Sequence, residues 1–109
     1  MKNRQIFDNR DAMYELDGQS FIWDKIKYEV NLNKHKIAFE EAATIFIDDR
    51  TEYYSDEKNS NDEERFIAVG ISNRFNVLIV CHCLRENETI IRIISARKAE
   101  KHEQKRGKR

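Results

Sequence analysis

Apolar positions in the first half of the chain predict a short strand followed by a helix. Residues 20–23 form a short run with bulky apolar side chains, and Asp24 after it is a typical helix N-cap. Ile26 and Val30 then recur at helical spacing, in a helix that we expect to end at His35. A polar stripe lies beside this pair and comprises Lys27, Asn31, Lys34 and His35.

A second helix is predicted from Phe39 to about Phe46. Its inward residues are expected to be Phe39, Ala42, Ala43 and Phe46. Ala38 occupies the N-cap position, where a side chain without an oxygen costs about 1 kcal/mol of helix stability. This helix therefore depends on packing more than on its cap.

The second half of the chain is rich in Ile, Val and Phe, which favour strands. Residues 51–54 are expected to form an edge strand. Three antiparallel strands are predicted at 66–72, 75–84 and 89–95, separated by hairpin-sized polar loops. The last helix is predicted from Arg97 to about Arg106, with Gly107 as its stop. The resulting order is β-α-α-β-β-β-β-α, an α+β fold with helices against one face of a curved antiparallel sheet.

The length of 109 residues fits one small domain with a thin core, since 37% of the residues are charged. Residues 1–17 have weak periodicity and are interpreted as an N-terminal arm of uncertain order. Residues 18–106 are the expected domain, and 107–109 are a basic tail. We find no internal repeat.

Twenty Lys and Arg balance twenty Asp and Glu, which excludes a uniformly basic nucleic-acid coat and an acidic disordered tail. The charges are nevertheless uneven. Residues 52–64 hold six acidic and one basic side chain, whereas residues 92–109 hold eight basic and two acidic ones. The basic end could meet a polyanion or could be a solvated terminal helix.

No apolar run approaches the roughly 20 residues that span a bilayer, and no signal peptide is visible, so a cytoplasmic protein is expected. Two cysteines are too few for a disulfide framework. Cys81 and Cys83 share one face of a strand and His82 lies on the other, without a second cysteine pair to complete a zinc site. We interpret the thiols as structural and expect no metal and no cofactor.

Arginine and aromatic residues near element ends remain as candidates for chemistry. Arg92 lies among isoleucines inside a strand, where an arginine needs either an ion pair, with Glu64 or Glu41, or a wet concave surface. Trp23 is either a core residue or a platform for a stacked base. His35 is either a cation at a helix C-terminus or a proton-transfer group.

These positions also carry a family pattern. The first part is Phe21-x-Trp23-Asp24-x-x-Lys27-x-x-x-Asn31-x-x-Lys34-His35-x-Ile37-x-Phe39-Glu40-Glu41-Ala42. The second part comprises Glu64-Arg65, Gly70, the run from Arg92 to Ala99, and Glu103. Over about residues 20–104 the chain closely resembles the BrnT family.

The resemblance implies a ribonuclease toxin of a type II toxin–antitoxin module, with a compact RelE-like fold. It also implies a BrnA-like antitoxin that binds DNA, joint repression of the operon, and a hetero-oligomer with two copies of each chain. The toxin alone would be a monomer or a dimer. The expected activity is metal-independent endonucleolytic cleavage of mRNA, which inhibits translation and arrests growth.

Such a reaction uses the 2′-hydroxyl of RNA as the nucleophile and needs a base, an acid and charge stabilisation. Arg65, Arg92 and Arg97 suit charge stabilisation, because guanidinium groups match phosphate oxygens. His35 is the expected proton-transfer residue. The expected substrate-binding residues are Trp23, Lys27, Lys34, Ser95 and Lys98, with Trp23 stacking a splayed base.

The chain departs from the family pattern in three places. Ala38 stands where the family usually has Ser, no proline follows the second helix, and Gly107 stands near the position of a common Tyr. An alternative is therefore an inactive toxin-like module that binds its antitoxin and tunes repression. A further alternative is nucleic-acid binding through the basic last helix, with a steep salt dependence and no cleavage.

Overall fold

The computed structural model describes residues 9–107, which form one sheet with helices on it. The strands are β1 (Asp11–Leu16), β2 (Gln19–Asp24), β3 (Glu52–Ser55), β4 (Phe66–Ile71), β5 (Val77–Arg85) and β6 (Ile90–Lys98). The helices are α1 (Lys25–His35), α2 (Phe39–Thr44) and α3 (Lys101–Gly107), with short 3₁₀ turns η2 (Ile45–Ile47) and η3 (Glu57–Asn59).

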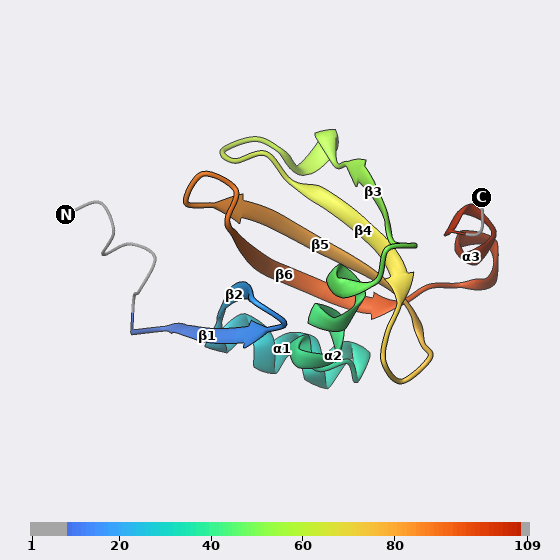
Figure 1. Cartoon of the computed structure of the whole chain (residues 1–109), viewed down its shortest axis with the longest axis horizontal. Coiled ribbons are helices and arrows are strands. Elements are labelled where there is room, and N and C mark those ends of the chain that lie inside the picture. Colours follow the sequence, from blue (N-terminus) through green and yellow to red (C-terminus); the bar gives the residue numbers. More distant parts are fainter. Residues whose placement is uncertain (1–8, 108–109) are drawn as a thin grey trace.

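The six-stranded sheet has the order β1-β2-β6-β5-β4-β3, and α1 and α2 pack on the same side of it (Figure 1). The α+β class, the three consecutive antiparallel strands and the edge position of β3 are confirmed. A wholly antiparallel sheet is wrong, because β2 runs parallel to β6. Hairpin loops determine only the pairing of consecutive strands, whereas this pair joins strands far apart in the chain.

The interpretation of residues 1–17 as a loose arm does not hold for β1. Asp17 and Gly18 both have positive φ, as a two-residue hairpin turn requires, so β1 folds back on β2 in antiparallel register. Ala12, Tyr14 and Leu16 pack against the core. Residues 1–8 of the expected arm, and 108–109 of the expected tail, lie outside the described residues.

Asp24 caps α1 by accepting hydrogen bonds from the backbone N–H groups of Ile26 and Lys27. The buried face of α1 lies opposite the face that the spacing of apolar residues predicts. Ile26 and Val30 are 62% and 59% exposed, whereas Asn31 of the polar stripe is buried.

A gap in the strand pairing explains why Asn31 is buried. Strand β2 pairs with β6 only from Ile90 to Arg92, so the following part of β6 has no strand neighbour on that side. The side-chain amide of Asn31 takes the place of a neighbouring strand. It donates to the carbonyl of Ala96 at 2.9 Å and accepts from the N–H of Ala96 at 3.1 Å.

The core lies between the sheet and the two helices. Its largest buried side chains include Phe21, Phe39, Ile37, Ile45, Leu78 and Ile93. At the N-terminus of α2, Ala38 makes no side-chain cap, as expected. Gly70 keeps β4 close to Thr51, since a Cβ at this glycine would collide with the Thr51 hydroxyl, which donates to the carbonyl of Ile45.

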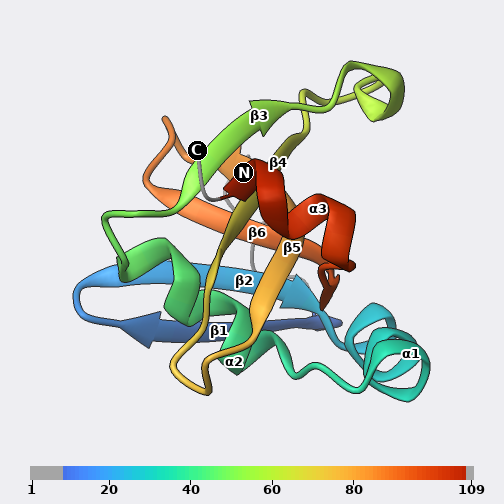
Figure 2. The same cartoon turned by 90° about the vertical axis from the view of Figure 1, so that its right-hand side faces the viewer.

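The predicted start of the last helix at Arg97 is wrong. Strand β6 stays paired with β5 through Lys98, and the N–H of Ala99 still donates to the carbonyl of Val77. This ladder outweighs the helical preference of the Ala-Arg-Lys-Ala sequence, so α3 begins only at Lys101. Figure 2 shows α3 at the end of the sheet where β6 finishes. None of the described helices has the length and apolar character to cross a membrane.

Candidate functional site

Arg92, Ser95 and Arg97 lie on one face of the sheet because of a bulge in β6. They pair with Cys83, Cys81 and Ile79 of β5, which are alternate residues and therefore share a face. Arg92 and Ser95 are three residues apart and would lie on opposite faces of a regular strand. The register shift at Cys81/His82 leaves Ile94 without a partner in β5, and this bulge brings Arg92 and Ser95 to the same face. We call this the polar face.

Arg65 joins the polar face from the residue before β4. Phe66 pairs with His82, whose ring packs with the rings of Phe66 and Phe46, so Arg65 belongs to the opposite face together with Cys81 and Cys83. Among the residues that the structure describes, no carboxylate forms an ion pair with Arg65. Its guanidinium is therefore available to an anionic ligand.

The two thiols beneath these arginines are inert. Burial raises the pKa of Cys81, and burial followed by the Glu63 carboxylate raises the pKa of Cys83 to about 11. Both therefore stay protonated near neutral pH. Within residues 9–107, no three His, Cys, Asp or Glu side chains gather as a metal site would require.

Arg92 is paired, but not with the expected partner. Its guanidinium donates to Asp11 of β1 at 3.1 Å, and the side chains are only 18% and 5% exposed. The predicted pairing with Glu64 or Glu41 is wrong. Glu41 instead accepts from Ser72 and Asn76 at the opposite end of the sheet. The true partner lies in the segment whose strand the sequence pattern did not reveal.

Arg97 is held by Glu103 of α3 through two hydrogen bonds of 2.9 and 2.8 Å. This pairing, and the backbone N–H of Glu100, lower the pKa of Glu103 to about 2. Arg97 and Glu103 line a hollow of about 310 Å³ with Tyr54 and the apolar side chains of β4. The pair thus fixes α3 over the end of the polar face.

A second hollow of about 310 Å³ lies between α1 and β6, beside the same part of the polar face. The residues that line it include Lys27, Lys34, His35 and Ser95. Burial, followed by the charges of Lys34 and Arg97, lowers the pKa of His35. The imidazole is therefore neutral at neutral pH, as a proton acceptor should be.

Two of the predicted site residues lie elsewhere. Trp23 is 3% exposed and packs its ring against those of Tyr14, Tyr28 and Phe39 in the core. Lys98 pairs with Leu78, so the strand register places it on the core face at the exposed end of β6. The polar face therefore gathers Arg65, Arg92, Ser95 and Arg97 on the sheet, with Lys27, Lys34 and His35 at its α1 border.

Asp11, Glu103 and Tyr54 were not assigned to the site from sequence. Asp11 becomes findable once the Asp17-Gly18 dipeptide is taken as a hairpin signal. Glu103 belongs to the recognised family pattern, and its contact with Arg97 depends on where α3 begins. Tyr54, which donates to Glu52 at 2.6 Å, gives no signal beyond its place in an edge strand.

A comparison with known protein families identifies the family of this chain. Residues 23–103 match the family described as a ribonuclease toxin, BrnT, of type II toxin–antitoxin systems. No curated protein sequence matches the chain significantly. The family match covers Arg65, Arg92, Ser95, Arg97 and Glu103 and confirms the resemblance found in the sequence. The chain therefore belongs to the BrnT family of ribonuclease toxins of type II toxin–antitoxin systems.

Proposed function

We propose that this protein is a metal-independent endoribonuclease that cleaves mRNA and thereby inhibits translation in the cytoplasm. The observation that carries the proposal is the polar face, where Arg65, Arg92 and Arg97 from two separate segments share one side of the sheet. Guanidinium groups on one face fit the phosphates of a single RNA strand. The RelE-like arrangement of this site is part of the same proposal.

The reaction would begin with attack of a ribose 2′-oxygen on the adjacent phosphorus, while the 5′-oxygen of the next nucleotide leaves. Neutral His35 would accept the proton of the 2′-hydroxyl, and the departing 5′-oxygen would take a proton from water, which leaves a 2′,3′-cyclic phosphate on the other fragment. Arg65, Arg92 and Arg97 would stabilise the non-bridging oxygens, whose negative charge grows in the transition state. Lys34, Lys27 and Ser95 border the hollow next to His35 and would bind the neighbouring backbone of the RNA.

Glu103 has a positioning role in this scheme. It accepts from both terminal nitrogens of Arg97, which fixes the plane of the guanidinium; the Lys98 carbonyl takes a third N–H group, so the Nε–H and one terminal N–H remain for a phosphate. Because its pKa is about 2, Glu103 is a carboxylate under all physiological conditions. Trp23 and Lys98 have no role in the proposal, since they do not lie on the polar face.

The test is expression of the chain without its antitoxin, followed by growth and RNA integrity. We expect Arg65→Ala and Arg92→Ala to abolish growth arrest and to lower RNA cleavage in vitro by about 10²–10³. Arg74→Ala, an exposed arginine in the hairpin between β4 and β5, is the matched control and should stay toxic. Cleavage should persist in EDTA. Full toxicity of both site variants would refute the site.

A second candidate function is an inactive toxin-like module that only holds its antitoxin. The pairing of Arg92 with Asp11 and of Arg97 with Glu103 favours it, because those cations are already neutralised. This alternative predicts healthy growth and intact RNA when the wild-type chain is induced alone. A BrnA-like, DNA-binding antitoxin with two copies of each chain per complex belongs to both proposals.

A further inference from the structure

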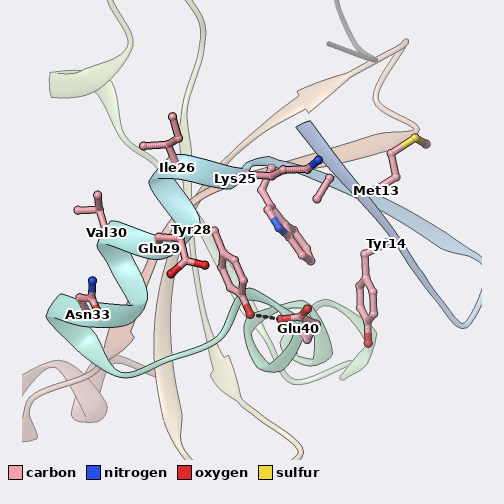
Figure 3. A pocket seen from close by; sticks show the side chains of 11 residues that line it. Met13, Tyr14, Lys25, Ile26, Tyr28, Glu29, Val30, Asn33 and Glu40 are labelled. Carbon is pink, nitrogen blue, oxygen red and sulfur yellow. Dashed lines mark hydrogen bonds between the residues drawn. The ribbon is translucent and has the colours of Figure 1, made fainter. Parts of the chain in front are cut away.

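A wide apolar groove lies on the far side of α1 from His35. It has a volume of about 570 Å³ and runs between α1 and the edge strand β1 (Figure 3). Met13 stands on the β1 side, and Ile26 and Val30 stand on the α1 side. These three side chains are 59–62% exposed, although each is large and apolar. Clustered exposure of this kind marks an interaction surface.

Two carboxylates and one ammonium group line the groove, those of Glu29, Glu40 and Lys25, so its net charge is negative. Glu29 projects from α1, and Glu40 accepts a hydrogen bond of 2.5 Å from Tyr28 at the floor (Figure 3). Burial and Glu40 raise the pKa of Tyr28 to about 12, so its hydroxyl remains a donor and one Glu40 oxygen stays occupied. The Glu29 carboxylate and the second Glu40 oxygen remain for a ligand.

The apolar lining and the net negative charge indicate which class of molecule binds in the groove. RNA would be repelled by the two carboxylates, which outnumber the single ammonium group of Lys25, and would find few polar partners. A two-fold contact between two copies of this chain would bring the acidic groove against itself. A protein segment that presents apolar side chains with a flanking lysine or arginine satisfies both the lining and the charge.

The groove is also continuous with the proposed nuclease site. Ile26 and Val30 line both the groove and the hollow that contains His35, Lys34 and Ser95. A partner segment bound along Ile26 and Val30 of α1 would therefore extend over the entrance to the hollow that contains His35. Binding and blocking of the site would be a single event.

We infer that the groove between β1 and α1 is the docking surface for the antitoxin, which contributes an apolar segment flanked by basic residues. The inference rests on the proposed function only for the statement that the covered site cleaves RNA. Docking itself needs only the partner protein that a type II module supplies.

The test uses the full-length chain and the purified protein encoded beside it in the same operon, with affinity measured by calorimetry. The double variant Ile26→Asp/Val30→Asp should weaken binding by at least about 30-fold, the effect of losing a central contact in an interface. Phe75→Asp places the same charge on an 88% exposed apolar residue of a distant hairpin and should change affinity less than about twofold. Circular dichroism checks that all three proteins fold equally.

A second pair of variants tests the negative charge of the groove without introducing a carboxylate among its apolar side chains. Glu29→Lys should weaken binding by about tenfold, whereas Glu57→Lys, an exposed change of the same charge in η3, should not. In cells, co-expression of the partner should restore growth for the wild type and fail to do so for a groove variant that remains toxic.

Several results would overturn the inference. These are unchanged affinity in the groove variants, equal losses in the control variants, and no binding of the partner to the wild-type chain. A wild-type dimer that becomes monomeric in the double variant, with partner affinity unchanged, would assign the groove to self-association. Loss of partner binding in the groove variants of a chain that cleaves no RNA would uphold the docking surface and refute only the proposed function.

Discussion

Strands β5 and β6 have two faces that are built in different ways. On the core face, Leu78, Val80 and Ile93 are at most 2% exposed and belong to the core cluster that also contains the buried residues of α2. On the polar face, the same strands carry Arg92 and Arg97, whose partners Asp11 and Glu103 come from segments outside β5 and β6. One face is held by packing and the other by ion pairs.

This difference separates stability from chemistry. Burial of large apolar side chains supplies most of the folding free energy, whereas the partly exposed ion pair between Arg97 and Glu103 supplies little. The end of the polar face next to α3 can therefore serve a ligand while the core face maintains the fold. In the proposed function, Arg97 keeps Glu103 as its partner and binds a phosphate through the N–H groups that Glu103 leaves unused.

The largest expected effect is on the core face. Phe39→Ala removes a fully buried ring that contacts Trp23 and Tyr28, and it should lower the free energy of unfolding by about 3–5 kcal/mol. Phe75→Ala also removes a phenyl ring, but from an 88% exposed position, and should change the free energy of unfolding by less than about 0.5 kcal/mol. Denaturant titration compares them, and equal losses would contradict the placement of the core.

The next prediction compares neighbouring residues on opposite faces. Arg97→Ala should lower the rate of RNA cleavage by about 10²-fold, because a charge-assisted donor to the transition state is lost. Lys98→Ala should lower it by less than about threefold, since its place in the register is on the core face. The measurement is initial cleavage rate on one RNA with both variants folded. A larger loss for Lys98→Ala would reverse the assignment of the faces.

The smallest expected effect concerns the pH dependence of the α3 contact. Arg97 holds the pKa of Glu103 at about 2, below its ordinary value of 4.5, so the pair stabilises the folded state above about pH 4.5. This contribution is lost as the pH falls from there toward 2. NMR titration of the Glu103 carboxyl group should show a midpoint at about pH 2, and Arg97→Ala should raise this midpoint. An unmoved midpoint would mean that the pair does not form.

Local sequence signals were enough for much of the framework. Asp24 and the helical spacing after it predict the start of α1, and the Ile and Val runs predict β4, β5 and β6. These features depend on neighbours in the chain, so a pattern reveals them. The Asp17-Gly18 turn belongs to the same class, and its two positive φ angles show that β1 was predictable from the dipeptide.

The site was different, because its arrangement depends on residues far apart in the chain. Sequence alone identified the family to which the chain belongs, and it proposed the arginines and the histidine as candidates for the site. The bulge at Ile94 decided that Arg92, Ser95 and Arg97 share a face, and the end of β2 pairing at Arg92 decided that Asn31 is buried while Ile26 and Val30 stay exposed. Strand register is set by packing of the whole sheet, so neither outcome is encoded in a local pattern.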